Sequence, residues 1–243
     1  PPLARVGEEA PDRSRRVLAP PTEVPASGAE SAAPAIEHPV ETDPYASLPT
    51  LETSDPEFLG ELGTLAPADL LARHLESQSL IRRLVVAIDN LPGGRLPMKQ
   101  RPVKAVGGAF AVEGEDDTLE IAPANYARYE PVIAVAEQVD ARALASLYRR
   151  YYPLFQQAYQ ELGYPDAYFN DRLVAVIDHM LDSAPVTGPL RLVRPNVLYR
   201  FADPALEARS PGQKILLRMG PANAERVKAV LRNWRAAIVA AAD

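Results

Sequence analysis

The residues best suited to acid–base chemistry lie in one segment, YFNDRLVAVIDHML, at positions 168–181. Asp171, Asp178 and His179 stand close together in it, with Arg172 among them. A histidine that faces carboxylates can act as a general acid or base, and an arginine can bind an anionic group of a substrate. One hypothesis is therefore a hydrolase-like enzyme with its site around Asp171, Asp178 and His179.

The same segment also has the pattern of an amphipathic helix at a protein surface. On a helical wheel, Asp171, Asp178 and Asp182 share one side, and apolar residues fill the other. His179 falls at the boundary, where it can hydrogen-bond to a neighbour. No His-x-x-x-His, Glu-x-x-His or Gly-x-Ser-x-Gly pattern occurs in the chain. The pattern favours a packing role, and we expect no catalytic residue, no bound metal and no cofactor.

Aromatic residues are concentrated between positions 148 and 169. Their helical spacing is typical of a buried face whose tyrosine hydroxyls reach a polar edge. The segment nevertheless contains more tyrosines than one core-facing stripe can use, so we expect an exposed subset. Tyrosine and arginine are enriched at protein interfaces. We therefore predict a partner-binding surface that consists of Tyr148, Tyr151, Tyr152, Tyr159, Tyr168, Arg191, Arg194 and Arg200.

Two simpler uses of these residues stay open. The aromatic side chains can instead form a groove for a small or lipid-like ligand. The arginines have Asp203 and Glu207 nearby in the sequence, which also fits a solvated or salt-bridged surface.

The composition argues against several classes of protein. The 243 residues carry a net charge of −6, and the pI is about 5.2. A nucleic-acid-binding surface needs clustered cations, so we expect no nucleic-acid partner. The absence of cysteine excludes disulfides, thiolate zinc sites and a cysteine nucleophile.

The first fifty residues differ from the rest of the chain. They contain ten of the 25 prolines and few large apolar residues. Such a segment buries too little apolar surface to offset its ordering entropy, and proline biases it toward an extended conformation. We predict an extended Pro-rich arm or linker at residues 1–50, followed by one helical domain at 51–243. No apolar run in the chain is long enough to span a bilayer.

Helix signals follow one another from residue 51 onward. Asp55, which precedes Pro56, is of a type that caps a helix N-terminus. Asp140 and Ser210 suit the same position in later helices. Pro153 should kink a helix and not end it. Further helices are predicted at about 67–75, 79–91, 140–162, 170–182, 210–219 and from 221 onward.

Strand signals are few. Residues 109–122 alternate around a Gly-Glu-Asp-Asp turn and predict a small hairpin. Residues 190–204 are compatible with extended pieces or with an irregular crossing. The predicted fold is mainly α: an irregular multi-helix domain with a minor β-hairpin, preceded by the extended Pro-rich arm.

Several runs of the sequence resemble an uncharacterised bacterial family known only as a domain of unknown function. The most specific are YFNDRL at 168–173 and YRFADP at 199–204, and the resemblance covers roughly residues 52–235. Members of that family look like inner-membrane proteins with an N-terminal transmembrane helix, a Pro-rich spacer and this domain. The resemblance implies a location on the periplasmic side of the bacterial inner membrane. It implies no catalytic residues.

Taken together, these features predict a non-enzymatic bacterial envelope protein, an interaction or scaffold domain tethered to the inner membrane. Its expected partner is an envelope or membrane protein. Membrane association is expected through a segment preceding Pro1 or through that partner. One alternative is an accessory subunit of a large membrane complex, with the N-terminal arm ordered on its partners. The hydrolase-like enzyme is the other.

Overall fold

Short helices follow one another in the first part of the chain. The computed structural model describes residues 35–43, 47–93, 97–115 and 118–240, all within a unit that spans 33–243. Most of the predicted arm, residues 1–34 and 44–46, lies outside the described residues. The first elements are α1 (Asp55–Leu65), α2 (Ala68–His74), α3 (Leu80–Asn90) and the short 3-10 helix η1 (Met98–Gln100).

Asp55 caps a different helix from the one expected. α1 begins at Asp55 itself, and its N-cap residue, Ser54, makes no side-chain capping bond. The Asp55 carboxylate accepts the backbone N–H groups of Ser79 and Leu80, at 2.6 and 2.8 Å, at the start of α3. The prediction was wrong because a carboxylate satisfies whichever unpaired helix N–H groups the tertiary structure brings to it.

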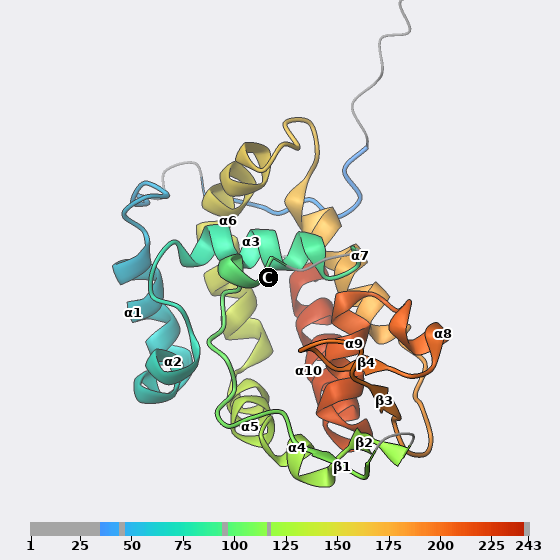
Figure 1. Ribbon diagram of the computed structural model, residues 1–243. Helices are drawn as coiled ribbons and strands as arrows, with labels where there is room; N and C mark the ends of the chain where they lie inside the picture. Colours follow the sequence, from blue (N-terminus) through green and yellow to red (C-terminus); the bar gives the residue numbers. More distant parts are fainter. Residues whose placement is uncertain (1–34, 44–46, 94–96, 116–117, 241–243) are drawn as a thin grey trace, which may run out of the picture. The chain divides into compact units, whose positions relative to one another are not determined.

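Two longer helices form the middle of the unit. After α4 (Pro123–Ala127) and α5 (Glu130–Gln138) come α6 (Ala141–Glu161) and α7 (Phe169–Leu181), as Figure 1 shows. The Asp140 side chain caps α6 by accepting the N–H of Ala143 at 2.8 Å, which confirms its predicted role. α6 continues through Pro153 and is followed by Gly163 at φ 119°.

The chain ends in three helices, and the last of them, α10, packs against several of the others. α8 (Pro204–Glu207) is a single turn, and α9 (Pro211–Met219) is capped by Ser210, whose hydroxyl accepts the N–H of Gln213 at 3.2 Å. The predicted cap at Ser210 is therefore confirmed. α10 (Pro221–Val239), red in Figure 1, contacts α5, α6, α7 and α9.

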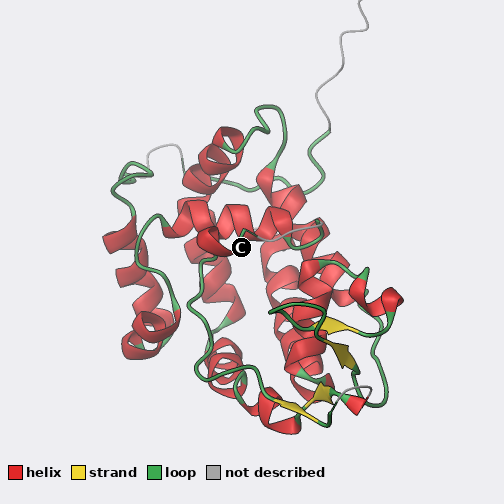
Figure 2. Ribbon diagram, viewed as in Figure 1, coloured by secondary structure: helices red, strands yellow, loops and turns green. Residues whose placement is uncertain are grey.

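Two small hairpins complete the unit (Figure 2). β1 (Val112–Glu113) pairs with β2 (Glu120–Ile121), and β3 (Leu192–Val193) pairs with β4 (Arg200–Phe201), both antiparallel. The first confirms the hairpin predicted at 109–122, and the second lies in the segment whose form the sequence left undecided. Backbone bonds join the two hairpins, from the N–H of Leu192 to the carbonyl of Leu119 and from the N–H of Ile121 to that of Leu190.

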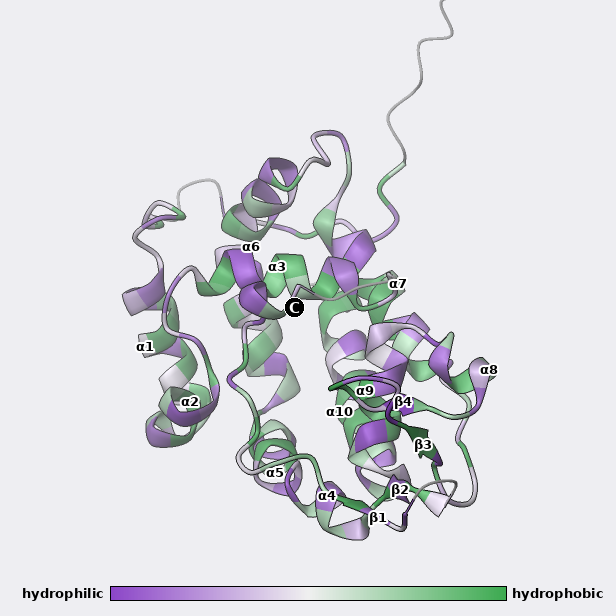
Figure 3. Cartoon of the chain, in the orientation of Figure 1, coloured by the Kyte–Doolittle hydropathy of each residue, from purple (hydrophilic) through white to green (hydrophobic). Residues whose placement is uncertain are grey.

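Two hydrophobic clusters hold these elements in place. The larger one lies among α1, α3, α6 and α7 and includes Leu80, Ile81, Val85, Tyr151, Phe155 and Phe169. The smaller one lies under the hairpins and consists of Ile121, Leu190, Leu192, Phe201 and Leu217. Figure 3 shows β3 in green, as a hydrophobic strand, and its Leu192 belongs to this second cluster. The mainly helical fold is confirmed, with a second hairpin in addition to the predicted one.

Candidate partner-binding site

Most of the tyrosines predicted to bind a partner are buried in the larger core. Between 0% and 9% of each residue's surface is exposed for Tyr148, Tyr151, Tyr152 and Tyr159. The expectation of an exposed subset is wrong for these four. The reason is that α6 contacts α1, α3, α7 and α10, so it is covered on several sides and uses more than one buried stripe.

The buried tyrosines direct their hydroxyls to polar groups at the edge of the core. Tyr151 donates to the carboxylates of Glu57 and Glu61, at 3.1 and 3.0 Å. Tyr148 donates to the side-chain oxygen of Asn170 at 3.1 Å. Burial raises the pKa of both phenols above the ordinary value of 10.0, so they remain protonated hydrogen-bond donors.

Tyr168 is half-buried and belongs to a separate arrangement at the start of α7. Its hydroxyl accepts the backbone N–H of Val40 at 2.7 Å. Asp171 accepts the N–H groups of Glu37 and His38 in the same stretch. Tyr168 and Asp171 therefore bind a short piece of this chain's own N-terminal segment.

The proposed acid–base residues do not share partners. The Asp178 carboxylate pairs with the Arg235 guanidinium, while Asp171 holds the N-terminal segment. His179 Nε2 lies 2.8 Å from the Ser210 hydroxyl, as expected for a boundary histidine. That hydroxyl already caps α9, and among the described residues no carboxylate hydrogen-bonds to His179. The geometry gives each side chain a packing or capping contact.

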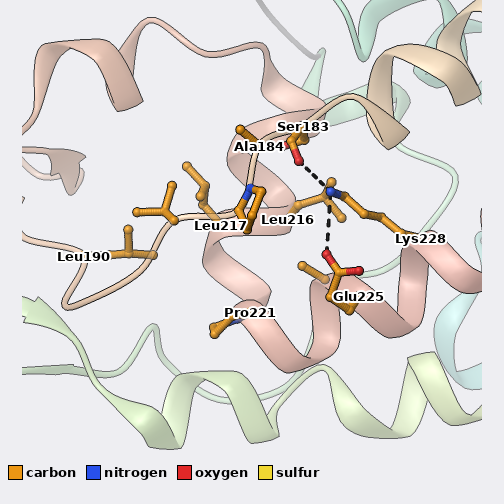
Figure 4. Close-up of a pocket in the computed structure, with 12 residues that line it drawn as sticks. Ser183, Ala184, Leu190, Leu216, Leu217, Pro221, Glu225 and Lys228 are labelled. Carbon is orange, nitrogen blue, oxygen red and sulfur yellow. Dashed lines mark hydrogen bonds and ion pairs between the residues drawn. The ribbon is translucent and has the colours of Figure 1, made fainter.

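A small pocket lies where the loop after α7 meets α9 and α10 (Figure 4). Its volume is about 60 Å³, and its lining is mostly apolar, including Leu190, Leu216 and Pro221. Pockets that bind small-molecule ligands usually measure about 300–1,000 Å³. The pocket is also distinct from the aromatic residues at 148–169, where the sequence suggested a ligand groove.

Lys228 lines this pocket, and its ammonium group is paired with other groups of the protein. Lys228 is 5% exposed, and its Nζ donates to the backbone carbonyl of Ser183. The Glu225 carboxylate lies 3.7 Å away. Lys228 therefore connects α10 to the end of α7, since a buried charge is stable only when it is paired and hydrogen-bonded.

The predicted arginines, in contrast, lie on an exposed loop. Arg191, Arg194 and Arg200 flank or belong to the β3–β4 hairpin, and all three are exposed. The two residues at the hairpin tip are apolar and also exposed: 80% for Val197 and 77% for Leu198. We call residues 191–200 the hairpin loop. It combines three cations with an exposed apolar tip and contains no acidic residue.

Aromatic residues pack at the base of the hairpin loop. Tyr199 packs against Phe110 of the first hairpin, with ring centroids 5.6 Å apart. The Arg194 guanidinium lies over the Tyr199 ring at 5.3 Å from its centroid. Phe201 is 3% exposed and anchors β4 in the smaller core. The exposed apolar tip therefore belongs to a hairpin whose base is held in place by packing.

Val197 and Leu198 were missed by the sequence reasoning. The available signal was the run RPNVLYR, in which two apolar residues follow a Pro-Asn pair typical of turns and lie between arginines. Apolar residues at a turn do not contribute to a strand or helix face. The sequence does not decide the structure of this run, because its strands contain only two residues each and so show no alternation of polar and apolar residues.

The Glu207 carboxylate accepts a backbone hydrogen bond from β4 at the base of the hairpin. We expect the stability of the hairpin to depend on the ionisation of this carboxyl. Burial alone would raise the pKa of this carboxyl. The backbone N–H of Phe201, at 3.0 Å, and the Lys214 ammonium, at 3.3 Å, favour the ionised form and lower the pKa below its ordinary value of 4.5. A carboxyl with a lowered folded-state pKa stabilises the fold above its unfolded-state pKa, and this contribution is lost as the pH falls through the folded-state value.

We therefore expect the Phe201 amide hydrogen to lose protection from exchange when the pH falls below 4.5. Hydrogen exchange, corrected for the intrinsic pH dependence, measures this. The Leu192 amide, which donates to the backbone of Leu119, is the internal reference. Glu207→Gln should reduce the protection of Phe201 already at neutral pH and abolish its acid dependence. Equal pH profiles for wild type and Glu207→Gln would contradict the assignment.

The described residues contain neither a membrane-spanning helix nor a cluster of metal ligands. Among residues 35–43, 47–93, 97–115 and 118–240, no helix has both the length and the apolar character needed to cross a bilayer. Within those ranges, no three His, Asp or Glu side chains are grouped as metal ligands.

Comparison with known proteins places the chain in a family. No curated protein and no solved structure matches it. One family model, described as a protein of unknown function (DUF3014), matches residues 80–235. This match confirms the resemblance to an uncharacterised domain family, and it includes α3, α6, α7 and the hairpin loop. Because it covers more than half of the 243 residues, the chain belongs to the DUF3014 family of proteins of unknown function.

Proposed function

We propose that this chain is a non-enzymatic interaction domain that binds a protein partner through the hairpin loop. The observation that carries the proposal is the exposure of Val197 and Leu198, at 80% and 77%. They lie on a loop whose base packs against the smaller core and the first hairpin. Burying each side chain at an interface is worth about 1.5–3 kcal/mol relative to leaving it in water. Two adjacent apolar side chains at a supported tip have the form of an interface anchor.

The charge of the loop indicates the kind of surface that it fits. Arg191, Arg194 and Arg200 border the apolar tip, whereas the whole chain has a net charge of −6. Arginine forms bidentate hydrogen bonds with carboxylates and packs on aromatic rings, which suits interfaces. The complementary partner surface has an apolar depression for Val197 and Leu198 with Asp or Glu side chains around it.

The location proposed for this interaction is the periplasmic side of the bacterial inner membrane. Support comes from the resemblance to membrane-anchored proteins and from the proline-rich composition of residues 1–50, which suits a spacer. In this proposal the domain is tethered to the membrane and binds another envelope or membrane protein as a scaffold.

The absence of cysteine allows a direct test of the proposed interface. Leu198→Cys introduces a single thiol into the chain, which can carry a cross-linker. Met98→Cys, at a residue that is 65% exposed on η1, is the matched control. In intact bacterial envelopes, the Leu198→Cys variant should yield a defined protein adduct that the Met98→Cys variant does not give. Transfer of the label to lipid alone would replace the protein partner with a membrane surface and overturn the proposal.

The partner identified in this way then permits a quantitative prediction. The double substitution Val197→Ser and Leu198→Ser should weaken binding by roughly 30-fold or more, as expected for the loss of two anchor residues. It should change the free energy of unfolding by at most about 0.5 kcal/mol, because both side chains are exposed. Titration calorimetry and urea unfolding measure the two effects. Unchanged affinity for that partner would contradict the proposal.

A further inference from the structure

The start of α7 binds a short segment of the chain, bent at residues 37 and 38, through the backbone of that segment. Three backbone N–H groups of residues 37–40 donate to side chains of α7 and its N-cap: Glu37 and His38 to Asp171, at 3.1 and 2.7 Å, and Val40 to Tyr168, at 2.7 Å. In the opposite direction, the Asn170 amide donates to the carbonyl of His38 at 2.9 Å. Figure 1 shows this blue segment passing the start of α7.

Pro39 fits this pattern because it has no N–H group to satisfy. Proline also narrows the conformations open to the residue before it, which limits the freedom of His38. Since the four bonds involve only backbone atoms of the segment, they place few demands on its side chains. The exception is Val40, which is partly buried and packs against the larger core.

Asn170, one of the receiving side chains, is held by the core as well as by the segment. Asn170 is 0% exposed, and its side-chain oxygen is held by the Tyr148 hydroxyl at 3.1 Å. Its amide group is therefore aimed at the place where His38 lies. Without an occupant, the Asn170 amide would lose this partner, which is costly for a buried group. The site thus has the polar complement of a bound peptide.

We propose that Tyr168, Asn170 and Asp171 form a docking site for short peptides that contain a proline followed by an aliphatic residue and that bend before the proline as residues 37 and 38 do. Residues 37–40 occupy this site as an intramolecular ligand. Main-chain hydrogen bonds can supply the affinity for a bound peptide, and a pocket for one side chain, here that of Val40, can supply specificity. The ligand is a segment of this class from another polypeptide, and it displaces residues 37–40. This inference does not depend on the hairpin loop.

The affinity that such a partner needs is set by competition with residues 37–40. A segment joined to its site by a short stretch of chain competes at an effective concentration in about the millimolar range. A peptide in trans must therefore compete with residues 37–40, and releasing them should raise its apparent affinity. Val40→Asp should release them, since it places a charge where Val40 packs on the core.

The experiment uses the full chain with Val40→Asp and a fluorescent synthetic peptide with the sequence of residues 35–43. Hydrogen exchange at Glu37 and His38 should show that the segment has been released. By fluorescence anisotropy, the variant should bind the peptide at least tenfold more tightly than wild type does. Absence of binding at millimolar peptide, or persistent protection of both amides in the variant, would overturn the proposal.

Two modified peptides test recognition through the backbone. Methylation of the backbone nitrogen at the position of His38 removes the N–H that donates to Asp171, so binding should be lost. Replacement of that histidine by alanine leaves all four backbone bonds possible and should change the affinity less than threefold. Equal binding of the methylated and unmodified peptides would show that the contacts do not determine recognition.

Discussion

Tyr151→Ala is expected to reduce the free energy of unfolding by about 3–5 kcal/mol, the range for removing a large aromatic side chain from a core. Tyr151 is 0% exposed, and its ring makes an edge contact with Phe58 at a centroid distance of 5.0 Å. The truncation leaves a cavity between α1 and α6, which contact each other in the larger core. Urea unfolding followed by circular dichroism measures the loss.

The conservative variant Tyr151→Phe separates packing from hydrogen bonding. It keeps the ring and removes the hydroxyl that donates to Glu57 and Glu61. Both carboxylates retain an ion pair with Arg150, at 3.1 and 3.2 Å. The expected loss is therefore only about 1 kcal/mol.

The same pair of variants distinguishes a core residue from a surface anchor. A tyrosine that served only to bind a partner would leave stability within about 0.5 kcal/mol when truncated and would weaken binding instead. Unchanged stability in Tyr151→Ala would therefore restore the original prediction for this residue and contradict its position in the core.

The second large effect is expected at the joint between α9 and α10. Gly220 has φ 83° and ψ 160°, a region of backbone conformation that is essentially restricted to glycine. A Cβ atom at this position would lie 2.6 Å from the ring of Tyr126. Gly220→Ala combines backbone strain with overpacking, each worth about 1–3 kcal/mol, so we expect a loss of roughly 3 kcal/mol or more.

Gly60 provides the matched control within the same chain. It lies inside α1, and a Cβ atom there would meet nothing within 4 Å. Gly60→Ala should raise the free energy of unfolding by about 0.5–1 kcal/mol, because alanine favours the helix. Thermal and urea unfolding of both variants test the contrast. Equal stability of the two variants would contradict the conformation described at Gly220.

Most residues of the run YFNDRL make contacts that position the start of α7. Tyr168, Asn170 and Asp171 hold residues 37–40, while Phe169 is buried in the larger core and Arg172 pairs with Asp89 at 2.8 Å. Two of the polar residues that first suggested acid–base chemistry, Asp171 and Arg172, thus organise the start of α7. The other two, Asp178 and His179, make contacts near its end. These contacts require no reacting molecule.

The sequence by itself determined the features that depend on neighbours a few positions away. Asp140 and Ser210 cap helices whose N–H groups lie three residues later, and β1 pairs with β2, which follows it closely in the chain. The helical periodicity also predicted the mainly α fold. These signals are readable because both members of each interaction are close in the chain.

Only the tertiary structure decided which surfaces are buried and which carboxylates find distant partners. Asp55 caps α3, and Asp171 binds residues 37 and 38, because packing brings those N–H groups to them. The tyrosines of α6 are buried because several helices surround it. Val197 and Leu198 are exposed because the hairpin is anchored at its base, by Phe201 and by the first hairpin. Burial depends on what covers a side chain, and one sequence does not state which of its segments will do so.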